Sequence, residues 1–130
     1  LTLAGNGESA RGRVESGVAY YREALNSDPT YGDAQNNLAW VLATHPNEGV
    51  RNGKEAVLLA EQAVNAKSGP APGLLDTLAA AYAEDHRFED AVRTAIQAIG
   101  QAKAGGQQKL ARSIEDRLQL YEAGRSFRVK

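Results

Sequence analysis

Small and apolar residues recur along this chain at matched distances. Gly17, Ala56 and Ala91 occupy equivalent places in three amphipathic segments, and they are separated by 39 and then by 35 residues. Two further columns keep the same separations: Tyr21, Ala60 and Ala95, and Ala24, Ala63 and Ala98. Several columns with one common offset indicate a unit of structure that is repeated along the chain. A fold built from stacked, similar units is therefore expected.

The segment 73–98 shows the repeating unit most clearly. Apolar residues recur at helical spacing after Leu74, and again from Phe88 through Ile96 to Ile99, on either side of a short polar turn. This pattern predicts two amphipathic helices joined by a tight turn. Small residues on the facing sides allow the helix axes to approach closely: Ala79, Ala91, Ala95 and Ala98. A helix pair this short cannot bury its apolar faces alone, so neighbouring pairs must stack on one another.

The repeats divide the chain at segments that are rich in Gly and Pro. The expected parts are a partial first unit over 1–29, a second unit over 30–69, a third unit over 70–103, a capping helix over 107–123 and a tail over 124–130. The second unit is longer than the others, because Leu38 and Ala56 are 18 residues apart where Leu78 and Ala91 are 13 apart. Five extra residues are therefore assigned to a loop over 44–53.

Helix ends can also be recognised in the sequence. Asn52 precedes Glu55 by three residues, a spacing typical of a helix that starts with a side-chain cap. Gly124 is expected to end the last helix, because glycine adopts the left-handed conformation that follows many helices. The tail from Arg125 onward is expected to be loose, with Phe127 able to fold back onto the helices.

Composition excludes several classes of function. The chain has 15 Lys+Arg against 16 Asp+Glu, and this net charge of -1 gives no sign of a nucleic-acid or anionic-membrane partner. No apolar run is long enough to insert into a membrane. With zero cysteines, disulfides and thiolate metal sites are excluded. The chain opens at Leu1 and contains no Met, so we expect a segment of a longer protein; its compartment is not fixed, with a cytoplasmic location favoured.

The third unit resembles the tetratricopeptide repeat family, whose period is roughly 34 residues. Leu75 lies at the family's opening aromatic position, Leu78 and Ala79 at its Leu-Gly pair, and Tyr82 at its first-helix tyrosine. Ala95 departs from the family, which usually has an aromatic residue there. The resemblance covers residue 1 to about residue 103. The sequences of segments 36–40 and 75–82 are similar to those of C-terminal repeats in large bacterial proteins with many such repeats. The resemblance implies an all-α, right-handed α-α superhelix of about three helix pairs, followed by a capping helix.

The resemblance also implies a function, because in this family the first helix of each unit lines a concave groove that binds a partner peptide. The chain would then be a protein-interaction scaffold within a longer protein. The resemblance places these residues in the groove: Asp33, Asn36, Asn37, Trp40, Thr44, Asp76, Thr77, Ala80 and Glu84. Their acidic members favour a basic or neutral peptide.

Two of these residues have alternative roles. Asn37 matches the position at which repeats of the O-linked N-acetylglucosamine transferase type hold a peptide backbone, but it can equally be a solvated polar residue. Trp40 is either an anchor in the groove or a packing residue beneath the loop over 44–53. Thr2, Gly73 and Thr77 stand where chaperone-binding members need cations, so capture of a chaperone's carboxylate tail is not expected.

No enzyme, cofactor or metal site is expected. His45 and His86 lie in predicted turns rather than within a helix, where two ligands four residues apart would share one face. Gly105 and Gly106 lack the strand and lysine of a phosphate-binding loop. The alternative to peptide binding is a structural role, in which the N-terminal end stacks on upstream repeats or on a second copy of the chain.

Overall fold

The computed structural model describes residues 16–28, 32–66 and 71–129, and every regular element within these ranges is a helix. The chain is helical over residues 16–27. Five more helices follow in order: α2 (Gly32–Thr44), α3 (Gly53–Ala66), α4 (Pro72–Glu84), α5 (Phe88–Ala104) and α6 (Gln108–Glu122). The predicted all-α class is confirmed for these ranges. The expectations for Thr2 and for the rest of residues 1–15 of the partial first unit lie outside the described residues.

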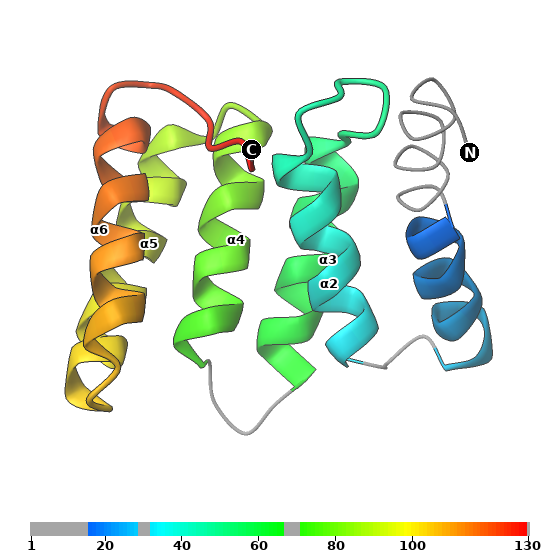
Figure 1. Ribbon diagram of the computed structural model, residues 1–130, viewed down its shortest axis with the longest axis horizontal. Coiled ribbons are helices and arrows are strands. Elements are labelled where there is room, and N and C mark those ends of the chain that lie inside the picture. Colours follow the sequence, from blue (N-terminus) through cyan, green and yellow to red (C-terminus); the bar gives the residue numbers. More distant parts are fainter. Residues whose placement is uncertain (1–15, 29–31, 67–70, 130) are drawn as a thin grey trace, which may run out of the picture.

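Consecutive helices lie side by side and reverse direction at each connection (Figure 1). α4 contacts both α2 and α6, so these three helices form one layer, which is at the front in Figure 1. α3 and α5 lie behind it. The three helices of the front layer run in the same direction. Their C-terminal ends therefore meet at one edge of the molecule, which we call the C-terminal edge.

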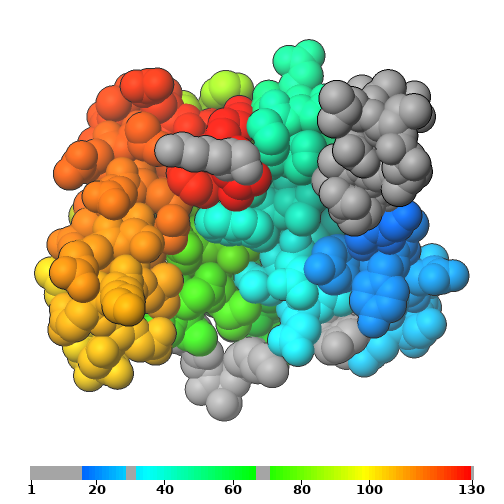
Figure 2. Space-filling model, in the orientation of Figure 1, coloured from blue at the N-terminus to red at the C-terminus, as the bar shows by residue number. Residues whose placement is uncertain are grey.

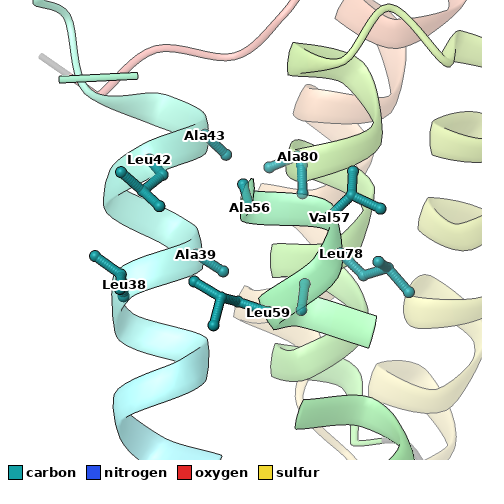
Figure 3. Close-up of a cluster of buried hydrophobic side chains, with 11 residues drawn as sticks. Leu38, Ala39, Leu42, Ala43, Ala56, Val57, Leu59, Leu78 and Ala80 are labelled. Atoms are coloured by element: carbon teal, nitrogen blue, oxygen red, sulfur yellow. The ribbon is translucent and has the colours of Figure 1, made fainter. Parts of the chain in front are cut away.

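Two clusters of buried apolar side chains hold the helices together. The first joins α2, α3 and α4, and Figure 3 shows Ala39 and Ala43 of α2 facing Ala56 and Leu59 of α3. The second joins α4, α5 and α6. Val64 and Tyr82 pack against both clusters, so the apolar interior is continuous from α2 to α6.

Alanine fills the closest contacts between α4 and α5, as the spacing predicted. The relative exposure is 0% for all four residues of that prediction: Ala79, Ala91, Ala95 and Ala98. The expectation that Ile96 belongs to the same buried face is wrong, because its side chain is 55% exposed. Successive residues of a helix are rotated by about 100°, so burial of Ala95 against α4 turns Ile96 toward solvent.

Three helices end with the same pair of hydrogen bonds. At the end of α4, the His86 N–H donates to the Ala83 carbonyl at 3.0 Å and the Arg87 N–H donates to the Tyr82 carbonyl at 2.8 Å. The residue after the cap has a positive φ in each case: 60° at His86, 76° at Gly106 and 70° at Gly124. This arrangement is the Schellman motif. The prediction that Gly124 ends the last helix is confirmed.

The start of α3 confirms a second local prediction. The connection from α2 spans 45–52, one residue shorter at each end than the predicted loop. The Glu55 N–H donates to Asn52 Oδ1 at 3.1 Å, as expected for a side-chain cap. The carboxylate of Glu55 does not return to the cap but pairs with Arg22, whose Nη1 lies 2.7 Å from Glu55 Oε2.

This connection packs against the end of α4. Arg51 donates from Nη1 to the carbonyls of His45 and Pro46, at 2.8 and 3.0 Å. Gly53 lies so close to α4 that a Cβ placed on it would be 2.8 Å from the Asp85 backbone nitrogen. The connection over 45–52 therefore forms a fixed structure at the C-terminal edge.

Candidate functional site

A segment at the end of the chain crosses the front layer. After Gly124 the chain leaves α6 and passes over α4 toward α2 without helix or strand structure (Figure 1). Figure 2 shows this segment, in red, seated between α6 in orange and α2 in cyan. We call residues 125–129 the tail. The sequence predicted a loose tail, and the structure instead places it against the face that was predicted to bind a peptide.

The tail donates hydrogen bonds to the C-terminal edge. The Val129 N–H donates to the carbonyl of Thr44, the last residue of α2, at 2.9 Å. The hydroxyl of Ser126 donates to the carbonyl of Ala83 in the last turn of α4 at 3.1 Å. The last four carbonyls of a helix have no partner within it, and they carry partial negative charge. Because the front helices are parallel, these acceptors are gathered along one line.

An aromatic contact fixes the middle of the tail. The ring centroids of Phe127 and Trp40 are 5.7 Å apart, with the rings inclined at 42°. The guanidinium carbon of Arg117, on α6, lies 5.1 Å from the Phe127 centroid and 5.6 Å from the Trp40 centroid. Both distances are typical of cation–π contacts. Three elements therefore meet at the Phe127 ring: α2, α6 and the tail.

Arg117 is held in place by Asp76 of α4. Its Nε and Nη2 donate to the two carboxylate oxygens at 2.9 and 2.6 Å, and both side chains are largely buried. Such a two-point contact fixes the orientation of the planar guanidinium group. Burial raises the pKa of the Asp76 carboxyl above its ordinary value, and the hydrogen bonds and charge of Arg117 offset part of this rise.

Glu84 joins the tail to the α2–α3 connection. Its Oε1 lies 2.7 Å from Arg128 Nη1, and its Oε2 lies 3.3 Å from Arg51 Nε. The Glu84 side chain is only 16% exposed, so its ion pairs are partly shielded from water. The carboxylate lies at the end of α4, where the helix already carries partial negative charge. This part of the edge therefore favours cationic side chains.

The structure separates the nine residues predicted for the groove. Four have buried side chains and do not face an open groove: Thr44, Asp76, Thr77 and Ala80, with exposures of 0%, 7%, 4% and 1%. The hydroxyls of Thr44 and Thr77 donate to carbonyls four residues earlier in their own helices. Ala80 belongs to the first core cluster. Neighbouring elements cover these positions: α2 packs against α4, Arg117 of α6 binds Asp76, and Val129 of the tail binds the Thr44 carbonyl.

The other five residues remain at the surface of the front layer. Trp40 and Glu84 are partly exposed and contact the tail, whereas Asp33 and Asn37 are exposed. The amide oxygen of Asn36 is buried and has no hydrogen-bond partner among the described residues. A hollow of about 370 Å³ lies beside the exposed pair, and its lining residues are Tyr20, Tyr21, Asp33, Ala34 and Asn37. We call this region the open part of the front layer.

Sequence reasoning missed the residues that hold the tail. Arg117 was assigned to a capping helix with no further role, and Arg51 and Arg128 were not singled out. Only Phe127 was expected to be able to fold back. The sequence did contain a signal. After the glycine that ends the last helix, the run Arg125-Ser126-Phe127-Arg128-Val129 has basic residues on both sides of an aromatic one.

The described residues offer no metal site, since no group of three or more His, Cys, Asp or Glu side chains comes together among them. Within the same ranges, no helix has the length and apolar character needed to span a bilayer. Comparisons with protein-family models, with curated proteins and with solved structures found no match for the chain.

Proposed function

We propose that this chain is a protein-interaction module of the tetratricopeptide kind, which binds a peptide segment of a partner protein across α2, α4 and α6. In this proposal α2 with α3 and α4 with α5 are helix pairs of a right-handed superhelix, and α6 is its cap. The contacts between successive helices and between α2 and α4 support it. So do the matching ends of α4, α5 and α6.

One observation carries the proposal: the front layer already has an irregular segment of chain bound to it. The tail uses a backbone N–H, a hydroxyl, an aromatic ring and a guanidinium group, and each meets a complementary group on the helices. These are the modes by which a peptide is generally recognised, since backbone groups supply general affinity and side chains supply selectivity. A partner peptide would bind across this face in the same way.

The test is a selection from a random peptide library on the intact chain. Selected peptides are expected to bind at least about tenfold more weakly to an Asp33→Ala/Asn37→Ala variant or to Glu84→Gln, a loss typical of hot-spot residues. Glu89→Gln is the matched control, because Glu89 is exposed on α5, behind the front layer. Circular dichroism checks that helicity is unchanged. Selected peptides that bind all variants equally well would contradict the proposal, as would a library without binders.

A second candidate function is assembly, in which the N-terminal end stacks on another copy or on upstream repeats. The observation in its favour is Tyr20, a large side chain that is 65% exposed on the helix over 16–27. The solution mass of the wild type and of Tyr20→Ser decides this alternative: a dimer that becomes a monomer in the variant supports assembly.

A further inference from the structure

The tail indicates which peptides the front layer would accept. Four consecutive residues make separate contacts: Ser126 at the end of α4, Phe127 between Trp40 and Arg117, Arg128 at Glu84 and Val129 at the end of α2. The first three side chains are small polar, aromatic and basic, and the fourth residue binds through its backbone N–H. A segment with this order can place each group opposite the same partner.

We infer that the partner is a protein segment with this order of side chains, and that the tail is an internal copy of it, which the partner must displace. The inference rests on the proposed function, and it adds the class of ligand and the regulation of the site. Charge supports the choice, because Glu84 and the carbonyls at the C-terminal edge are acceptors that complement a cationic segment rich in N–H donors.

The tail is suited to displacement. Residues 126–129 remain partly exposed, and none belongs to the buried set of either core cluster. Phe127 packs against the second cluster only from outside. Release of the tail would therefore leave the helices packed, and would free Glu84 and the ring of Trp40 for another segment. Arg117 would stay in place through its two-point contact with Asp76.

Competition by the tail has a predictable size. A segment tied to its site through a short connection, here the one from α6, has an effective concentration on the order of millimolar. If the tail occupies the site for about 90 to 99% of the time, the apparent Kd of a free peptide rises about 10- to 100-fold. The free peptide is therefore expected to bind poorly to the wild type and well to a chain whose tail has been released.

The experiment uses the intact 130-residue chain and a labelled peptide with the sequence Gly-Arg-Ser-Phe-Arg-Val, that of residues 124–129. Phe127→Ser/Arg128→Glu releases the tail, and fluorescence anisotropy measures binding. We expect the released variant to bind the peptide at least about tenfold more tightly than the wild type does. Adding Glu84→Gln to the released variant should remove most of this binding, whereas adding Glu89→Gln should leave it unchanged. The fluorescence emission of Trp40, the single tryptophan, reports when the phenylalanine ring of the peptide is bound beside it.

Several results would overturn the inference. One is a released variant that has normal helicity but does not bind the peptide. Another is equal binding of the peptide by the wild type and the released variant. A third is that the released variant binds Gly-Phe-Ser-Arg-Val-Arg, which has the same composition in another order, as tightly as it binds the tail peptide. If the double variant unfolds, Phe127→Ala provides the same comparison, because it removes only the ring. A wild-type dimer that is absent in the released variant would show that a second copy's tail is the occupant.

Failure of this inference can be distinguished from failure of the proposed function. Library peptides that depend on Asp33, Asn37 or Glu84, in the absence of binding by the tail peptide, would leave the interaction face standing and remove the internal copy. Absence of both kinds of binding would remove both proposals.

Discussion

The front layer has two parts that differ in how their polar groups are satisfied. Where the tail lies, Asp76 is buried with Arg117 and Glu84 is shielded between two arginines. In the open part, Asp33 and Asn37 face solvent beside exposed Tyr20. The residues predicted to line the groove thus include both buried side chains and side chains that are available to a partner. Helical position alone does not decide which is which, because the neighbours that cover these residues come from α6 and the tail.

The largest expected effect on stability distinguishes Asp76, beneath the tail, from Asp33 in the open part. Asp76→Ala leaves the Arg117 guanidinium, whose side chain is 13% exposed, without its carboxylate. Loss of one partner of a buried ion pair costs about 3–5 kcal/mol of unfolding free energy. Asp33→Ala in the open part should change it by no more than about 0.5 kcal/mol. Urea unfolding followed by circular dichroism measures both, and similar values for the two variants would contradict the distinction.

Alanine substitutions at Gly53 and Gly73 are expected to give the next largest changes in stability. Gly53→Ala places a methyl group 2.8 Å from the backbone at the end of α4, and overpacking of this kind costs about 1–3 kcal/mol. Gly73→Ala is the matched control, because Gly73 is exposed in α4 and a Cβ there meets nothing within 4 Å. It should stabilise the chain by about 0.5–1 kcal/mol. Thermal melts in parallel test both signs, and a neutral Gly53→Ala would mean that the connection moves away from α4.

A smaller effect is expected at the helix end beside the tail. His86 adopts a φ of 60° where α5 and α6 have glycine after the cap. The left-handed conformation costs a non-glycine residue about 1 kcal/mol, so His86→Gly should stabilise the chain by about this amount. Guanidinium unfolding measures the change. A loss of stability would show that the His86 ring, 6.1 Å from the Phe88 ring, contributes more than the backbone strain removes.

The smallest expected effect is a pH dependence. The raised pKa of Asp76 means that the folded state binds its proton more tightly than the unfolded state does. The associated stability is present below the ordinary pKa of aspartate and is lost as the pH rises through the raised value. The wild type should therefore gain unfolding free energy relative to Asp76→Asn as the pH falls from 7 to 4. Urea midpoints across this range test the sign, and a relative loss in acid would contradict it.

The sequence predicted what depends on neighbouring residues. The cap at Asn52, the stop at Gly124 and the alanine contacts between α4 and α5 follow from local spacing, and the structure has all three. The state of the candidate site depends on contacts between distant residues. Asp76 and Arg117 are 41 residues apart, and Ser126 and Ala83 are 43 apart. No periodicity links such pairs, so the burial of Asp76 and the docking of the tail could not be predicted from the pattern.

The side chains of Val64 and Tyr82 have a consequence for how the chain unfolds. Each touches the apolar interior on both sides of α4, so neither half can lose its packing without exposing part of the other. Stacked helical units often melt one after another from an end, because each contacts only its neighbours. Here the shared residues couple the two halves into one cooperative transition. Trp40 fluorescence, which reports α2, and circular dichroism, which reports all helices, should therefore give coincident denaturation curves.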